Sequence, residues 1–211
     1  MIPTREEMYA ALEARHGRER QKKFSEAAVA VCGLGGLGSN VAIHLARAGV
    51  GRLTLIDFDN VDISNLNRQQ YFPDQLGRPK AEALRETIHR IAPYCEINAV
   101  SAKITDDNMA ELLGDCGFIC ECFDKANQKA MLVNGVLENF PGKYLVAASG
   151  MAGLGSANEI VTRKAGGRFY ICGDGHSDVN ELGTLYAPRV AVCAAHEATM
   201  ILRLISGETG P

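Results

Sequence analysis

The sequence predicts an α/β fold in which helices cover both faces of a doubly wound, mainly parallel sheet. Short apolar runs alternate along most of the 211-residue chain with segments whose apolar residues recur at helical spacing. After residue 150 two strand-like runs, 158–164 and 167–173, follow one another with no helix between them. This change of pattern predicts antiparallel strands at one edge of the sheet.

The elements are expected in the following order. Apolar Met8 and Leu12 lie among many charges in the first 25 residues, which predicts an N-terminal helical segment on the surface. Residues 27–50 predict a buried strand, a glycine turn and a helix, and residues 52–58 predict a second strand parallel to the first. The later elements are a helix over about 79–91, a strand over 96–100, a short helix over 107–113, a strand over 117–120, a helix over 125–139, a strand within 143–150 and a closing helix over 189–206.

The domain organisation is expected to be simple. No internal repeat or linker divides the chain, so we expect one domain over residues 1–211, with a helical segment at 1–25. Residues 173–188 are polar and glycine-rich and show no periodicity. Such a segment favours a flexible loop near an active site.

Composition excludes several classes of function. A formal net charge of -3 gives no basic field for nucleic acid or anionic lipid. No apolar stretch approaches the roughly 20 residues that span a bilayer. The amino terminus is too charged for a secretory signal. We therefore expect a cytoplasmic protein with no nucleic-acid and no membrane partner.

The seven cysteines are an odd number, which favours reduced thiols over a disulfide framework. Structural zinc usually requires two close pairs of the CxxC type, whereas Cys120 and Cys122 are separated by a single residue. Alternation along a strand would place both on the same face, where small buried hydrophobic side chains are the simpler interpretation. No zinc site is expected.

A glycine motif indicates a nucleotide site. Gly33, Gly35 and Gly38 form G-x-G-x-x-G after a predicted strand and before a predicted helix, and Gly36 lies within it. This context lets phosphate bind backbone amides at a helix N-terminus. Asp57 ends the next strand, where an acidic side chain can accept hydrogen bonds from ribose hydroxyls.

The residues that follow favour ATP over NAD. A dinucleotide site needs one acidic residue here and no cations, because backbone amides and the helix dipole hold the pyrophosphate. In this chain Asn65, Arg68 and Lys80 follow, together with Gln69. Arginine and lysine suit a triphosphate whose charge develops during transfer, although a solvated surface remains the alternative for both. Calcium is not expected, because the glycine and glutamate of its helix-loop-helix site are absent.

Asp124 is a further candidate at the carboxyl edge of the sheet, where ligands of open α/β sheets bind. It could coordinate Mg²⁺ through the phosphates. It could equally cap the helix that follows.

Four segments together resemble the ThiF, MoeB and ubiquitin-activating superfamily. They are GLGGLGSN (33–40), GVGRLTLIDFDNVDISNLNRQ (49–69), GRPKAEAL (77–84) and ECFDKAN (121–127). LVAASGMAG and APRVAVCAAHEA are most similar to the compact ThiF-like proteins of anaerobic bacteria. The resemblance implies a Rossmann-like fold and an adenylyltransferase that activates the C-terminal glycine carboxylate of a small ubiquitin-like or sulfur carrier protein.

The resemblance also implies roles for individual residues. Asp57 would hold the ribose, Asn65, Arg68 and Lys80 would hold the phosphates and promote adenylyl transfer, and Asp124 would bind Mg²⁺. Catalysis would then consist of positioning and charge stabilisation, with no covalent nucleophile. The full set expected to bind ATP is Gly33, Gly35, Gly36, Gly38, Asp57, Asp59, Asn65, Arg68, Gln69, Lys80 and Asp124. For Asp59 and Asp62 the residue types themselves favour capping or loop-building hydrogen bonds.

The chain departs from the family pattern at three places. The usual arginine-aromatic-x-arginine-glutamine pattern of the N-terminal helix is missing, which leaves Arg15, Arg18 and Arg20 as candidates, with Arg18 and Arg20 nearest the expected place. In the family this arginine often comes from the partner of a homodimer. The zinc tetracysteine and the loop cysteine that handles sulfur are also missing. The nearest thiols, Cys172 and Cys193, are flanked by apolar residues, which favours inert buried cysteines and another protein that supplies sulfur.

The leading hypothesis is an adenylyltransferase acting on a ThiS-like sulfur carrier, in thiazole formation for thiamine. Three alternatives stay open. One is activation of a small molecule or tRNA base, as in threonylcarbamoyladenosine dehydratases. The others are a scaffold that binds nucleotide without turnover and an NAD-dependent oxidoreductase, which shares the glycine motif.

Overall fold

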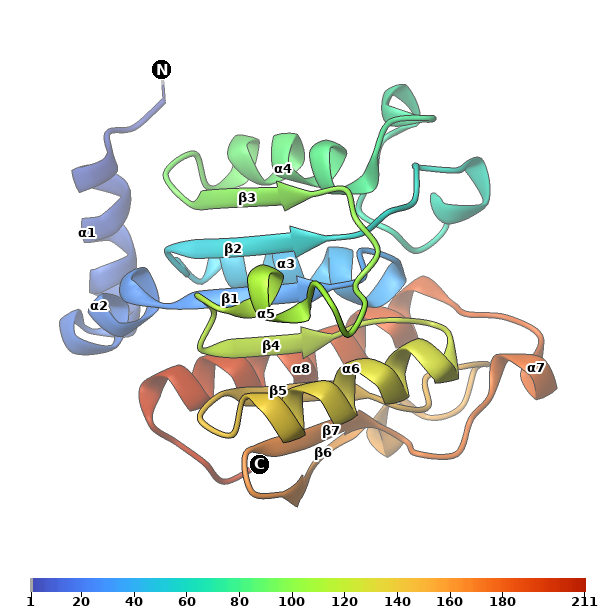
Figure 1. Cartoon of the computed structure of the whole chain (residues 1–211). Helices are drawn as coiled ribbons and strands as arrows, with labels where there is room; N and C mark the ends of the chain where they lie inside the picture. Colours follow the sequence, from blue (N-terminus) through green and yellow to red (C-terminus); the bar gives the residue numbers. More distant parts are fainter. Residues whose placement is uncertain (1) are drawn as a thin grey trace.

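The computed structural model describes residues 2–211 (Figure 1). Within these residues it forms a seven-stranded sheet. The strands are β1 (Ala28–Cys32), β2 (Arg52–Ile56), β3 (Glu96–Val100), β4 (Phe118–Glu121), β5 (Tyr144–Ala148), β6 (Val161–Gly166) and β7 (Phe169–Gly173). No helix in this part of the chain is long and apolar enough to cross a bilayer.

The strand order is β3-β2-β1-β4-β5-β7-β6. All neighbouring pairs are parallel except β6 and β7, which pair antiparallel. The order runs outward from β1 to β3 and then returns to the other side of β1 with β4. The carboxyl ends of β1 and β4 therefore mark the point at which ligands bind in such sheets. The predicted fold class is confirmed, including the antiparallel edge.

Helices cover both faces of the sheet because every central strand is apolar on both sides (Figure 1). Val29 and Val31 belong to one core cluster, whereas Ala28, Ala30 and Cys32 belong to the other. The first cluster packs under α3 (Gly36–Arg47), α4 (Lys80–Ile91) and α8 (Ala187–Ser206). The second packs under α5 (Met109–Leu113) and α6 (Ala126–Asn139).

The N-terminal segment forms two helices, α1 (Arg5–His16) and α2 (Arg18–Glu26), beside the amino ends of the strands (Figure 1). A capping box between Thr4 and Glu7 begins α1, and α1 buries none of its residues. Short helical turns lie in the loops: η1 (Ile63–Asn65), η2 (Pro73–Gln75), η3 (Ala157–Glu159) and α7 (Val179–Leu182). The predicted 173–188 loop thus contains one turn of helix, begun by an Asp178 cap.

Candidate nucleotide-binding site

The glycine turn joins β1 to α3 at the carboxyl edge. Gly33 has a φ of +90°, and a β-carbon there would lie 2.9 Å from the Cys122 carbonyl oxygen. A β-carbon on Gly38 would collide with the Gly33 carbonyl oxygen. The first amides of any α-helix have no partner within the helix. The N-cap of α3 is Gly35, which has no side chain, so no side-chain cap occupies these amides. The turn therefore has the geometry of an anion-binding helix terminus.

Asp57 follows β2 and is buried, with 8% of its surface exposed. Its Oδ2 accepts a hydrogen bond from the Leu34 N–H at 2.6 Å, and its Oδ1 accepts one from the Asp59 N–H at 2.8 Å. Burial raises the pKa of this carboxyl, and the two N–H donors oppose that rise. Asp57 thus connects the glycine turn to the following loop, a role that its predicted ribose contact does not explain.

Lys80 begins α4 and is the buried cation of the site. Its Nζ lies 3.2 Å from Asp59 Oδ2, and the side chains are 7% and 53% exposed respectively. The Lys80 N–H also donates to the Asp59 carbonyl, at 2.9 Å. Asp59 therefore pairs with the predicted phosphate-binding lysine, which is a more definite role than loop building.

The loop with Asn65 and Arg68 is formed by local hydrogen bonds. Asp62 caps η1 by accepting from the Ser64 N–H, and the Asn65 Oδ1 accepts from the Asp62 N–H. The capping role predicted for Asp62 is confirmed. The Arg68 stem packs against Gly36, which places this arginine beside the glycine turn. Its Nη1 donates to the Ser64 carbonyl at 3.2 Å.

Gln69 also lies beside the turn, with its Nε2 3.9 Å from the position of a β-carbon on Gly35. Its side chain is buried, and within residues 2–211 its Oε1 has no hydrogen-bond partner. A buried acceptor without a partner is uncommon in folded proteins. This observation fits a bound group that supplies a donor at the turn.

Asp124 follows β4 in the segment that passes the glycine turn, where Cys122 and Phe123 lie against Gly33. Asp124 is exposed, and Lys125, not Asp124, is the cap residue of α6, with no side-chain cap bond. The capping alternative is therefore wrong. A single accessible carboxylate beside a phosphate site suits Mg²⁺, which usually takes one or two carboxylates together with phosphate oxygens.

The N-terminal arginines lie elsewhere. Arg20 pairs with Glu208 at 3.2 Å, and Lys23 donates to the Ser206 carbonyl at the end of α8. Helix α8 begins beside the carboxyl ends of the strands, and its 20 residues extend about 30 Å. The end of α8 therefore lies beside the amino ends of the strands. Arg18 and Arg20 belong to α2, which lies beside the amino ends of the strands (Figure 1), so both are remote from the glycine turn of their own chain.

All seven cysteines are buried and unbridged. Cys120 and Cys122 belong to the same core cluster, as the strand alternation predicts. Burial raises the pKa of Cys172 to about 12 and that of Cys193 further still, and the nearby Glu197 carboxylate adds to both shifts. The expected burial of both thiols is confirmed, and a buried thiol with a raised pKa is a poor nucleophile.

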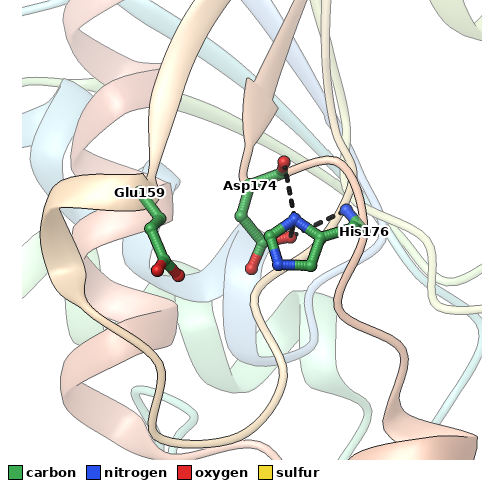
Figure 2. Close-up of side chains that lie close together, drawn as sticks. All are labelled: Glu159, Asp174 and His176. Carbon is green, nitrogen blue, oxygen red and sulfur yellow. Dashed lines mark hydrogen bonds and ion pairs between the residues drawn. The ribbon is translucent and has the colours of Figure 1, made fainter.

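A second charged group lies at the carboxyl end of β7 and the amino end of β6. Figure 2 shows Glu159, Asp174 and His176 close together, with two hydrogen bonds between His176 and Asp174. Among the described residues these three are the group whose ligand atoms have a metal-binding spacing. Arg189 pairs with both acids, since its Nη2 lies 2.5 Å from Asp174 Oδ2 and 3.5 Å from Glu159 Oε2. His176 is largely exposed, as expected of a loop residue.

Two polar pairs at the carboxyl edge were not predicted from the sequence. One is Asp174 with Arg189. In the sequence, this pair could have been suspected from an acidic residue that lies between two glycines directly after a strand. The other is Glu121 with Lys129, which lie 2.8 Å apart. Its signal is a lone charge inside an apolar strand run, with a lysine two helical turns further on. Glu121 also accepts from the Phe123 N–H at 2.8 Å, and thereby shapes the segment that leads to Asp124.

Comparison with known sequences agrees with this geometry. The model of the ThiF family matches residues 9–211. The molybdopterin-synthase adenylyltransferase of Salmonella typhimurium is 42% identical over 118 residues, which cover 56% of this chain and 47% of that protein. The Escherichia coli protein of the same name is 30% identical over 197 residues, covering 90% of this chain and 78% of that protein. The tRNA threonylcarbamoyladenosine dehydratase of E. coli is 37% identical over 120 residues, covering 56% and 45%.

The chain spans about half the length of the first and third of these relatives. A crystal structure of the E. coli tRNA N6-threonylcarbamoyladenosine dehydratase TcdA in complex with AMP superposes with a TM-score of 0.86. The two sequences are 23% identical, and the match covers 98% of each chain. At this identity the likeness shows the fold alone. The family match over residues 9–211 agrees with the glycine turn and with the charged loop that carries Asn65 and Arg68. The chain is therefore a member of the ThiF family.

Proposed function

We propose that this protein is an ATP-dependent adenylyltransferase that converts the C-terminal glycine carboxylate of a small carrier protein into an acyl adenylate. One observation carries the proposal. Lys80, Asn65 and Arg68 come from one segment, residues 65–80, and Arg68 packs against the glycine turn, where a phosphate-binding helix terminus begins. The amides of the glycine turn alone could hold a pyrophosphate. The two added cations suit a nucleotide whose phosphates react, because they stabilise the negative charge that develops.

The reaction follows from these groups. A carrier carboxylate oxygen attacks the α-phosphorus of ATP, the bond to the bridging oxygen breaks, and pyrophosphate leaves. Lys80 and Arg68 stabilise the negative charge that develops on the phosphates, and Asn65 helps to hold them. Asp124 would hold Mg²⁺, which would supply further neutralisation of phosphate charge when bound.

The names of the relatives support a carrier protein as the substrate. They include molybdopterin-synthase adenylyltransferases and a sulfur carrier protein adenylyltransferase from Thermus thermophilus, which is 33% identical over 131 residues. We propose a ThiS-like carrier with a glycine-glycine end, acting in thiazole formation for thiamine. No residue of the glycine turn or charged loop is a nucleophilic thiol, so another protein would deliver sulfur to the adenylate.

A homodimer belongs to the proposal. If an N-terminal arginine contributes to catalysis, a second copy of the chain must supply it, because Arg18 and Arg20 lie at the opposite edge of their own sheet. Replacing both arginines with acidic residues would then lower activity. ATP binding to a single chain, apart from its partner, would not be weakened. Light scattering of the wild type measures the oligomeric state directly.

The test is exchange of labelled pyrophosphate into ATP, in the presence of Mg²⁺ and a purified carrier with an intact glycine-glycine end. The expected result is exchange that requires the carrier and is lost when its last glycine is removed. Absence of exchange with every such carrier would overturn the proposal.

A second candidate is ATP-dependent dehydration of a modified tRNA base. The 37% identity to the E. coli dehydratase over 120 residues favours it. The net charge of -3 opposes it. Filter binding of bulk tRNA decides between the two, because only this second function requires retention of tRNA.

A further inference from the structure

We propose that Tyr71 is a positioning residue of the nucleotide site, which orients one peptide group of the glycine turn. The inference rests on the proposed function, since it assigns a new residue to the same ATP site. Tyr71 is an uncharged residue of the segment 65–80 that bears Asn65, Arg68 and Lys80, and nothing in the family resemblance gave it a role.

Tyr71 is buried, with 6% of its surface exposed. Its hydroxyl donates to the Leu34 carbonyl oxygen at 2.8 Å. The N–H of Leu34 donates to Asp57 Oδ2 at 2.6 Å. The two successive peptide groups that meet at Leu34 are therefore each held by a buried side chain.

The second of these peptides joins Leu34 to Gly35. It is trans, so its carbonyl and its N–H point in opposite directions. When Tyr71 holds the carbonyl, the Gly35 N–H points away from Tyr71. Gly35 is the N-cap of α3, and its amide belongs to the group that would bind phosphate. Tyr71 thus sets the direction of one phosphate donor without touching the nucleotide.

The same segment also carries Arg68. The Asn40 Nδ2 donates to the Arg68 carbonyl at 3.2 Å and to the Gly36 carbonyl at 2.6 Å. Gln70 donates to Ser39 Oγ through its N–H and to Asn40 Oδ1 through its Nε2. Residues 68–71 and the glycine turn are therefore held in one arrangement, and the Tyr71 hydroxyl is its most buried link.

The experiment compares Tyr71→Phe with a matched control. Tyr170 of β7 is buried as well, and its hydroxyl donates to the carbonyl of Thr209 in the C-terminal segment at 2.9 Å. Each Tyr→Phe change keeps the ring and removes one hydroxyl bonded to a carbonyl. Calorimetry of ATP binding and urea unfolding are measured for both variants and the wild type.

The expected result is that Tyr71→Phe raises the Kd for ATP about three- to tenfold, the range for loss of one hydrogen bond's orienting effect. The KM for ATP in the exchange reaction should rise by a similar factor, with a smaller change in kcat. Tyr170→Phe should lower the urea midpoint to a similar extent and leave both constants unchanged.

If Tyr71→Phe lowers the urea midpoint but leaves the Kd for ATP unchanged, Tyr71 is structural and the inference is overturned. The proposed function fails in a different way, namely when the wild type binds ATP but catalyses no exchange. In that case the Kd comparison still decides the role of Tyr71. A wild type that binds no ATP would overturn both.

Discussion

Two of the ion pairs at the carboxyl edge of the sheet differ clearly in their exposure to solvent. Lys80 pairs with Asp59 through side chains that are 7% and 53% exposed. Arg189 pairs with Asp174 through side chains that are 5% and 0% exposed. Asp174 also accepts hydrogen bonds from the N–H groups of His176 and Ser177.

This difference separates a pair available for chemistry from a pair that holds the fold. The partner of Lys80 is half in water, so a phosphate can replace or join it at low cost. The Asp174 carboxylate is enclosed, and each of its oxygens is bonded, so breaking the pair leaves a buried charge. Residues 173–188 are therefore anchored at Asp174.

Arg189→Met should have the largest effect, a loss of about 3–5 kcal/mol in the free energy of unfolding, because Asp174 would remain buried without its partner. Urea unfolding followed by circular dichroism measures this loss. Arg203→Met on the same helix is the control, since Arg203 pairs with Glu208 at the surface. The control should change stability by no more than about 0.5 kcal/mol. Equal losses in the two variants would contradict the contrast.

Lys80→Ala should reduce carrier-dependent pyrophosphate exchange by about 100-fold or more, the usual cost of one group that stabilises transition-state charge. The exposed Asp59 that it leaves behind can be solvated, so stability should fall far less than in Arg189→Met. Lys22→Ala, on exposed α2, is the control and should retain full exchange. Unchanged exchange in Lys80→Ala would indicate a nucleotide-binding scaffold without turnover.

Acid should weaken the buried pair. Burial by itself raises the pKa of Asp174, but hydrogen bonds from Ser177, His176 and Arg189 outweigh it and hold that pKa below its ordinary value. A depressed pKa stabilises the fold above the unfolded value of about 4 and loses this effect as pH falls toward the folded pKa. Wild-type stability should thus fall more steeply below about pH 4 than that of Asp174→Asn. Parallel curves would show that Asp174 does not titrate in this way.

Asp59→Asn should have the smallest effect. Because the amide oxygen can still accept a hydrogen bond from the buried Lys80 Nζ and the position is half exposed, the free energy of unfolding should change by less than about 1 kcal/mol. The KM for ATP should change only modestly, since Lys80 remains in place. A loss of stability comparable to that in Arg189→Met would mean that the two pairs are alike.

Most of the fold could be predicted from the sequence, because periodicity and glycine positions determine it locally. The strand at 96–100 has the predicted bounds, and α4 and α6 each begin within one residue of the predicted start of the helix. The site residues with a clear signal follow strand ends, as Asp57 and Asp124 do. They could be located because the carboxyl ends of parallel strands meet at one edge.

The rest depended on tertiary contacts without periodicity. Asp174 and Arg189 are 15 positions apart across an irregular segment, and only the folded loop brings them together. The contact between Tyr71 and Leu34 spans 37 positions, and no spacing rule predicts it. The remote position of Arg20 likewise follows from the packing of α2 against the end of α8, which the sequence does not reveal.

The most direct test of the central claim is intact-mass spectrometry of a ThiS-like carrier after incubation with this protein, ATP and Mg²⁺. We expect a carrier heavier by one adenylyl group, and we expect this added mass to disappear when the carrier's last glycine is removed or when Lys80→Ala replaces the wild type. A carrier of unchanged mass, under conditions in which the wild type binds ATP, would contradict it.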